Sequence, residues 1–179
     1  MENKLEKIYL GGGCFWCLEA VFQRVRGVKK VTSGYSGGNL ENPTYEEVSS
    51  GMSGHVEVVE IEYDQNEISF ETLLDIFFDI HDPTSLNKQG NDIGTQYKSI
   101  ILVTSPNQLA MTMKKIGELN NSGKYNSPLV TEIKKFEKFY PAEDYHQNFY
   151  LNNQSYPYCT VVIDPKLKKF MEHFSQIVR

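Results

Sequence analysis

The sequence predicts an α+β protein whose core follows the order β-α-β-β-α-β. Short segments of alternating polarity predict strands, longer segments with apolar residues every three or four positions predict helices, and turn residues separate them. This order matches the split βαβ, or ferredoxin-like, arrangement, with helices on one face of a small mixed sheet. Further helices and two long loops are appended, and we expect residues 1–179 to form a single domain.

The first half of the core is the most regular part of the pattern. A strand over residues 8–10 ends at three consecutive glycines. A helix is predicted over residues 14–26, because its apolar side chains recur at helical spacing, and it stops at Gly27. Strands are predicted over residues 28–35 and 55–63.

Two further helices begin at predicted serine caps. Ser69 and Ser105 each precede an apolar periodic segment, and serine side chains accept hydrogen bonds from the free N–H groups of a first helical turn. The second helix has proline at its first position and ends before Gly123. Its inner face is expected to comprise Leu109, Met113 and Ile116.

The rest of the chain gives weaker signals. A strand is predicted over residues 97–103, and the lysine-rich segment 129–139 is interpreted as another. A short helix is expected to begin at Pro141. Asp164 is predicted to cap the last helix, whose inward side chains are expected to be Leu167, Phe170, Met171, Phe174 and Ile177.

Two segments are predicted to be long loops. Residues 34–45 and 84–94 are rich in Gly, Asn, Ser and Pro. Loops of such length in a compact domain are usually functional or disordered. Tyrosines in the first loop favour a functional role; the alternative is a disordered surface loop with incidental tyrosines.

Composition limits the possible partners and locations. The net charge of −5 argues against nucleic acid as the main partner. The sequence has no apolar run long enough to cross a bilayer and no apolar signal core near Met1, so we expect a cytoplasmic protein. Three cysteines are too few for a disulfide framework. We take a monomer as the starting assumption.

The segment Gly11–Cys17 carries the clearest chemical signal. Cys14 lies at the predicted helix N-terminus, where free N–H groups and the helix dipole stabilise an anion. A lowered thiol pKa and an enhanced nucleophilicity are therefore expected. Cys17 lies one turn further on, within reach of a disulfide after local adjustment. The pair is interpreted as an attacking thiol and a resolving thiol.

Two other interpretations of the cysteine pair remain open. A structural zinc site would use Cys14 and Cys17 as half of its ligands, but the sequence has no second pair at short spacing. The other alternative is a pair of small buried residues without chemistry. Neither interpretation requires a catalytic role.

Glu57 is the candidate acid. It shares strand parity with the apolar residues Val59, Ile61 and Tyr63, so it is expected to face the buried side. A desolvated carboxyl has a raised pKa, as a general acid near neutral pH requires. The alternative is a bulge at residues 56–59 that turns Glu57 to solvent.

Taken together, the motifs resemble those of the A-type peptide methionine sulfoxide reductases. The matching blocks run in the family's order over residues 8–165, almost the whole chain. They are Gly13-Cys14-Phe15-Trp16, Gly34-Tyr35-Ser36-Gly37-Gly38, Asn42-Pro43-Thr44-Tyr45, residues 50–59, His81-Asp82-Pro83-Thr84, residues 89–97 and residues 140–147.

The resemblance implies a role for each matching position. It makes Cys14 the nucleophile that attacks the sulfoxide sulfur and Glu57 the acid near the sulfoxide oxygen. It implies that Tyr45 and Tyr97 are hydroxyl donors to that oxygen. It also implies that Phe15 and Trp16 form the walls of the pocket for the S-methyl group. Asp92 and His146 match polar positions near the site, with less definite roles.

The resemblance also implies how the enzyme is recycled. Many family members carry the resolving cysteine in a C-terminal tail, whereas residues 170–179 of this chain contain no cysteine. A subset of the family has two cysteines three residues apart and uses the second as the resolving cysteine, and Cys17 is similar to that second cysteine. Cys159 is interpreted as a packed residue. Thioredoxin as reductant, the S epimer as substrate, and no metal or organic cofactor are implied.

Two other function classes compete with the one that this resemblance implies. The first is a thioredoxin-type thiol–disulfide oxidoreductase, which would use Cys14 and Cys17 but gives no role to Glu57 or the tyrosine loops. The second is a small metal-binding or protein-binding module.

Overall fold

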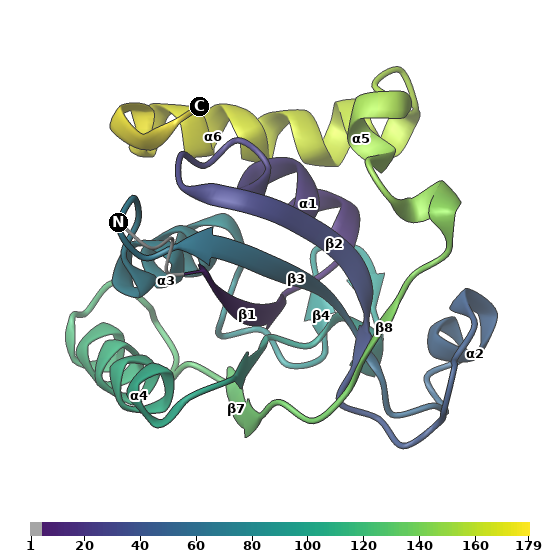
Figure 1. The fold of residues 1–179 in the computed structure, drawn as a ribbon, viewed down its shortest axis with the longest axis horizontal. Helices are drawn as coiled ribbons and strands as arrows, with labels where there is room; N and C mark the ends of the chain where they lie inside the picture. Colours follow the sequence, from purple (N-terminus) through teal and green to yellow (C-terminus); the bar gives the residue numbers. More distant parts are fainter. Residues whose placement is uncertain (1–4) are drawn as a thin grey trace.

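A computed structural model describes residues 5–179 and has a mixed α+β architecture, which confirms the predicted class (Figure 1). Six strands form one sheet in the order β7-β6-β1-β3-β2-β8. All neighbouring strands are antiparallel except β6 and β7. The strands are β1 (Leu5–Gly11), β2 (Val28–Ser36), β3 (Val56–Asp64), β6 (Ile100–Val103), β7 (Glu132–Lys135) and β8 (Phe139–Pro141).

The main core lies between the sheet and the helices. Alternate side chains of β1 and β3, such as Leu10 and Ile61, point into it and are fully buried. Helix α1 contacts both the sheet and α6, so it lies between them (Figure 1). The helices are α1 (Phe15–Phe22), α2 (Tyr45–Ser49), α3 (Phe70–Ile80), α4 (Pro106–Asn121), α5 (Phe149–Asn152) and α6 (Asp164–His173).

The other face of the sheet carries a smaller apolar cluster. Tyr9, Val58 and Leu102 belong to it. The chain between β7 and β8 runs from one edge of the sheet to the other, and Phe136 on this segment stacks on Tyr9 with 3.9 Å between ring centroids. The predicted strand over residues 129–139 is therefore wrong in extent, because two short strands at opposite edges replace it.

Helix α4 shows the largest error in a predicted face. Leu109 and Met113 are 40% and 60% exposed, whereas the polar Gln108 and Thr112 are buried. The Gln108 amide explains the rotation of the helix, because its oxygen accepts from Thr104 N at 2.8 Å and its nitrogen donates to Lys7 O at 3.0 Å. The serine caps are confirmed: Ser105 Oγ accepts from Gln108 N and Ser69 Oγ from Thr72 N, each at 3.1 Å.

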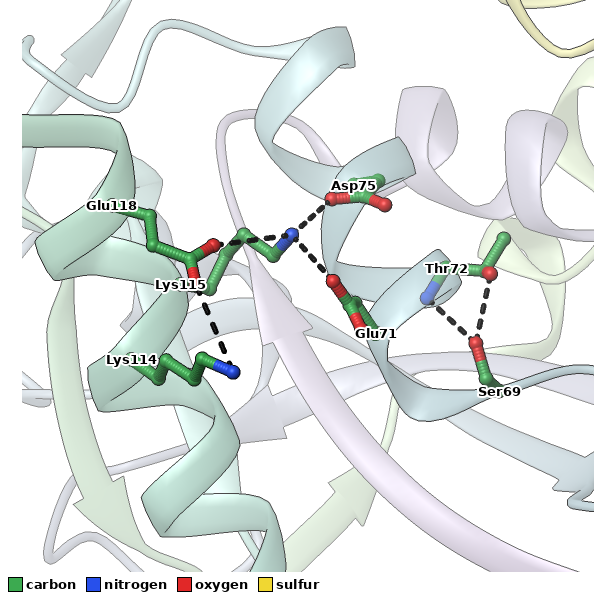
Figure 2. Close-up of polar contacts among 7 residues, drawn as sticks. All are labelled: Ser69, Glu71, Thr72, Asp75, Lys114, Lys115 and Glu118. Atoms are coloured by element: carbon green, nitrogen blue, oxygen red, sulfur yellow. Dashed lines mark hydrogen bonds and ion pairs between the residues drawn. The ribbon is translucent and has the colours of Figure 1, made fainter. Parts of the chain in front are cut away.

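An ion-pair cluster joins α3 to α4. Lys115 Nζ lies 3.1 Å from Glu71 and 2.8 Å from Asp75 on α3, and 4.0 Å from Glu118 on its own helix (Figure 2). Burial opposes the charge on Lys115, but the hydrogen bonds from its ammonium to Asp75 and Glu71 raise its pKa. The cluster fixes α4 against α3 at the edge of the helix layer.

The two predicted loops contain short regular elements. Helix α2 ends the first loop, and its first turn is held by a capping box between Thr44 and Glu47. The second loop contains a two-stranded hairpin, β4 (Lys88–Gln89) and β5 (Asp92–Ile93). A 3-10 turn, Thr95–Tyr97, follows it, so β6 begins three residues later than predicted.

The C-terminal third also departs from prediction. The short helix expected from Pro141 begins instead as a 3-10 turn, Asp144–His146, before α5. Asp164 does not cap α6, because a π-helical turn, Cys159–Ile163, leads directly into that helix. Met171, expected to point inward, is 42% exposed. In the described part of the chain, none of the helices is both long and apolar enough to cross a membrane.

Candidate active site

Cys14 is the N-cap of α1 and follows β1 after a glycine turn. Gly13 has φ = +90°, a conformation that favours glycine, and a Cβ there would lie 3.0 Å from the Gln89 side chain. Gly13 N donates to Tyr97 O at 3.1 Å, which ties the turn to the end of the second loop. The helix is shorter than predicted, but the placement of Cys14 at its start is confirmed.

Glu57 on β3 reaches the same helix end. Its side chain is 1% exposed, and Oε1 accepts from Phe15 N at 3.2 Å. Burial raises the Glu57 pKa to about 8, with a further contribution from Asp92 and an opposing one from the Phe15 hydrogen bond. The pairing of β3 with β2 is regular around Tyr35 and Glu57, so the alternative bulge that exposes Glu57 is wrong.

The thiol of Cys14 does not have the lowered pKa that its helix position predicts. Burial raises the pKa well above its usual value, and the charges of Glu57 and Cys17 raise it further. A hydrogen bond from the Trp16 backbone acts in the opposite direction but is the smaller effect. Because Glu57 is itself protonated at neutral pH, the two neighbouring groups are both neutral in the free protein.

Two tyrosines approach this pair from the two loops. Tyr45 is the first residue of α2, and its N–H donates to Glu143 Oε2 at 3.0 Å. Tyr97 ends the 3-10 turn after the hairpin. Burial raises the pKa of both hydroxyls, and the charges of Glu57 and Cys14 add to the effect. Both tyrosines are thus protonated donors within electrostatic reach of Cys14.

Aromatic rings surround the start of α1. Trp16 is half-buried and stacks on Phe149 with 3.6 Å between ring centroids, while Phe15 is fully buried beside His146. Trp16 Nε1 donates to His146 Nδ1 at 3.1 Å, which assigns the proton of a neutral imidazole to Nε2. Burial lowers the His146 pKa, and among the described residues Nε2 has no partner. The ring of Tyr45 lies 4.6 Å from that of His146.

Asp92 is connected to the second cysteine. Its Oδ2 accepts from the Tyr158 hydroxyl at 2.6 Å, and Tyr158 Oη lies 3.7 Å from Cys17 Sγ. A cavity of about 420 Å³ is lined by Cys14, Asp92, Tyr158 and Lys166, among others. All nine residues predicted for the site therefore lie in one region of the molecule.

All three cysteines have free thiols. Cys17 is 2% exposed and Cys159 is fully buried in the main core, next to helix α6. Burial raises the pKa of Cys17, while the charge of Lys166 and the hydrogen bond with Tyr158 act in the opposite direction. Across residues 5–179, no group of three or more His, Cys, Asp or Glu side chains is placed to hold a metal ion.

Several residues of the site were not predicted from the sequence. Glu143 accepts from both Tyr35 Oη, at 2.9 Å, and Tyr45 N, so it anchors the tyrosine loop. Glu19 on α1 is buried and accepts from Phe149 N at 3.2 Å, and burial raises its pKa to about 7. Tyr158 precedes Cys159, and no periodic pattern marks it as a site residue. Glu57 was identified as a carboxylate on the apolar face of a predicted element, and the same signal could have identified Glu19.

Comparison with known proteins agrees with this geometry. A model of the family "Peptide methionine sulfoxide reductase" matches residues 6–177. A peptide methionine sulfoxide reductase MsrA from Nautilia profundicola is 54% identical over 168 residues, which cover 94% of this chain and 95% of that protein. One from Sulfolobus acidocaldarius is 55% identical over 172 residues, covering 95% and 96%.

Solved structures share the fold. Mxr1 from Saccharomyces cerevisiae in reduced form has a TM-score of 0.78 and 31% identity, covering 87% of this chain and 90% of Mxr1. Mxr1 in complex with Trx2 has a TM-score of 0.55 and 23% identity, covering 83% and 89%. The second likeness concerns the fold alone.

Proposed function

The chain belongs to the peptide methionine sulfoxide reductase family, and from this premise we propose that it reduces the S epimer of methionine sulfoxide, free or in proteins, to methionine. One observation carries the proposal. The hydrogen bond from Phe15 N to Glu57 places a buried, protonated carboxyl at the start of the helix that Cys14 caps. This arrangement supports a reaction in which Cys14 is the nucleophile and Glu57 the proton donor.

In the proposed first step, Cys14 Sγ attacks the sulfoxide sulfur. Glu57 protonates the sulfoxide oxygen and takes up the proton of the Cys14 thiol, so its own protonation is unchanged at the end of the step. The substrate's sulfur–oxygen bond and the transient bond between the two sulfurs both break as the hydroxyl passes to Cys14 Sγ. The hydroxyls of Tyr45 and Tyr97 act as fixed donors to the same oxygen. Methionine leaves, and Cys14 carries a sulfenic acid.

The aromatic residues supply the apolar side of the site. A sulfoxide is polar at oxygen and apolar at the methyl group, and aromatic rings contact methyl groups and sulfur favourably. We assign Phe15 and Trp16 to the methyl group. His146, with a free Nε2–H, and Asp92 are assigned to polar parts of the substrate.

In the second step, Cys17 Sγ attacks Cys14 Sγ, which forms a disulfide and releases water. Thioredoxin is the proposed reductant and restores both thiols through a mixed disulfide. The reduced form of Mxr1 is similar to this chain, and a crystal structure of Mxr1 in complex with Trx2 also exists. This complex supports thioredoxin as the reductant. We further propose a ferredoxin-like core, a single domain, a cytoplasmic monomer and a role in the repair of oxidised proteins.

A coupled assay tests the proposal. The protein is combined with thioredoxin, thioredoxin reductase and NADPH, and the S and R epimers of N-acetyl-methionine sulfoxide are supplied separately. NADPH consumption with S alone is expected. Activity on S with dithiothreitol but not with thioredoxin would overturn the proposed recycling, and no activity on either epimer would overturn the function.

The runner-up function is tested by the same preparation. A general thiol–disulfide oxidoreductase would reduce a small disulfide faster than the thioredoxin system does alone, and would leave both sulfoxide epimers unchanged. Cys14→Ser tests the proposed nucleophile, because it is expected to abolish methionine formation completely. Sustained methionine formation by this variant would exclude Cys14 as the nucleophile.

A further inference from the structure

A line of hydrogen bonds leads away from the thiol of Cys17. Cys17 Sγ lies 3.7 Å from Tyr158 Oη, and the Tyr158 hydroxyl donates to Asp92 Oδ2 at 2.6 Å. A tyrosine hydroxyl has one proton to donate, so the oxygen remains free to accept from the thiol. The order is therefore Cys17 S–H to Tyr158 O–H to the Asp92 carboxylate.

Three separate segments form this line. Cys17 comes from α1, Asp92 from the β4–β5 hairpin and Tyr158 from the chain before the π-helical turn. Its far end lines the cavity of about 420 Å³ that also contacts Cys14. A proton that reaches Asp92 is thus delivered to the space beside the first thiol.

The buried position of Cys17 makes proton removal a problem. Burial raises the pKa of Cys17, and the charges of Asp92 and Cys159 raise it further. The charge of Lys166 and the hydrogen bond with the Tyr158 hydroxyl lower the pKa of Cys17, and the charge of Cys17 in turn raises the pKa of Cys14. Little thiolate is present at neutral pH, so the thiol needs a base as it attacks.

We propose that Tyr158 is a catalytic residue of the resolving step, in which it carries the proton of Cys17 to Asp92. The proposal rests on the proposed function, in which Cys17 condenses with the sulfenic acid of Cys14. Asp92 accepts this proton and returns it to the departing hydroxide, so it is a second catalytic residue of the step.

The atoms and electrons of the step balance. The sulfur–sulfur bond forms as Cys17 Sγ attacks Cys14 Sγ and the bond from Cys14 Sγ to its hydroxyl breaks. The Cys17 proton moves to Tyr158 Oη while the Tyr158 proton moves to Asp92. Asp92 then protonates the departing hydroxide in the shared cavity, and water leaves.

Tyr158→Phe removes the hydroxyl and keeps the ring, which lies edge-on to Trp16 with 5.7 Å between centroids. Tyr156→Phe is the matched control, since Tyr156 also lies edge-on to Trp16, at 6.4 Å, on the same segment. Reduced protein is mixed with N-acetyl-methionine S-sulfoxide without reductant. Methionine release and loss of free thiols are followed in the same sample.

In Tyr158→Phe, thiol loss is expected to slow about 10²-fold relative to the methionine burst of the same variant. A reagent that traps sulfenic acids should label Cys14 in this variant. The Tyr156→Phe control is expected to keep the ratio of the two rates found in the unmodified protein. An unchanged ratio in Tyr158→Phe would refute the relay.

The pH profile excludes a merely structural role for Tyr158. With the relay removed, the rate of thiol loss should rise steeply with pH, because hydroxide then takes the Cys17 proton, and Asp92→Asn should show the same steep rise. Parallel profiles for variant and unmodified protein would contradict the proposal. Absence of a methionine burst in the unmodified protein would instead refute the underlying function.

Discussion

Replacement of Glu57 by glutamine tests whether the fold raises the pKa of this side chain, so that it is protonated at neutral pH. Glutamine has nearly the same shape and keeps an oxygen that accepts from Phe15 N, but it cannot ionise. The pKa of Glu57 is about 8 in the folded protein against an ordinary 4.5. The folded state therefore binds a proton more tightly than the unfolded chain does.

The sign of the effect on stability follows from this difference. A carboxyl with a raised pKa stabilises the fold below its ordinary pKa, and this stabilisation is lost as pH rises through about 8. Each unit of pKa corresponds to about 1.4 kcal/mol. Between about pH 5 and about pH 8, the unmodified protein should lose roughly 3 kcal/mol of unfolding free energy through this group alone.

Urea unfolding at several pH values measures the difference. The Glu57→Gln variant should gain roughly 3 kcal/mol relative to the unmodified protein between those pH values. Glu19 titrates in both proteins and cancels in the comparison. Glu62→Gln, on the same strand but partly exposed, is the control and should leave the profile unchanged. Parallel profiles for Glu57→Gln and the unmodified protein would refute the argument from burial.

Three further predictions concern other parts of the chain. Cys17→Ser should release one methionine per protein molecule and then stop with thioredoxin present, as chromatography can measure; continued cycling would exclude Cys17 as the resolving thiol, and Cys159→Ser should cycle normally. Glu19→Ala should cost about 1–3 kcal/mol in urea unfolding, because Phe149 N loses its buried acceptor; an unchanged midpoint would contradict this. Ser105→Ala should cost about 1 kcal/mol through the lost cap of α4, visible as a lower melting temperature, and an equal melting temperature would exclude the cap.

The sequence predicted those features that depend on local periodicity. Strand parity placed Glu57 on the buried face of β3, and the structure shows it there. The serine caps and the position of Cys14 at the start of α1 were also predicted, since each depends on a few neighbouring residues.

Features that depend on distant contacts were not predicted. Leu109 on α4 is exposed because Gln108 finds partners on Thr104 and Lys7, and a hydropathy pattern ranks such a glutamine as a surface residue. The lowered pKa expected for Cys14 rested on the helix end alone, whereas burial by the rest of the fold dominates.

The residues of the candidate site also divide into those that a local sequence pattern predicts and those that it does not. Glu57 has a local signature, whereas Tyr45, Tyr97 and His146 were identified through the family resemblance. Tyr158 joins the site only because the C-terminal segment folds back across α1 and the hairpin. No spacing rule connects residues so far apart in the sequence.

Trp16 is the only tryptophan in the chain, and in the sequence it lies between Cys14 and Cys17, the two cysteines of the proposed reaction. Its indole stacks on Phe149 and donates to His146, so movement of α1 or of the segment around α5 changes its surroundings. Intrinsic fluorescence excited in the indole band therefore arises from this site with no background from other tryptophans. The protein carries a built-in optical probe, by which substrate entry, disulfide formation and reduction can each be timed without a label.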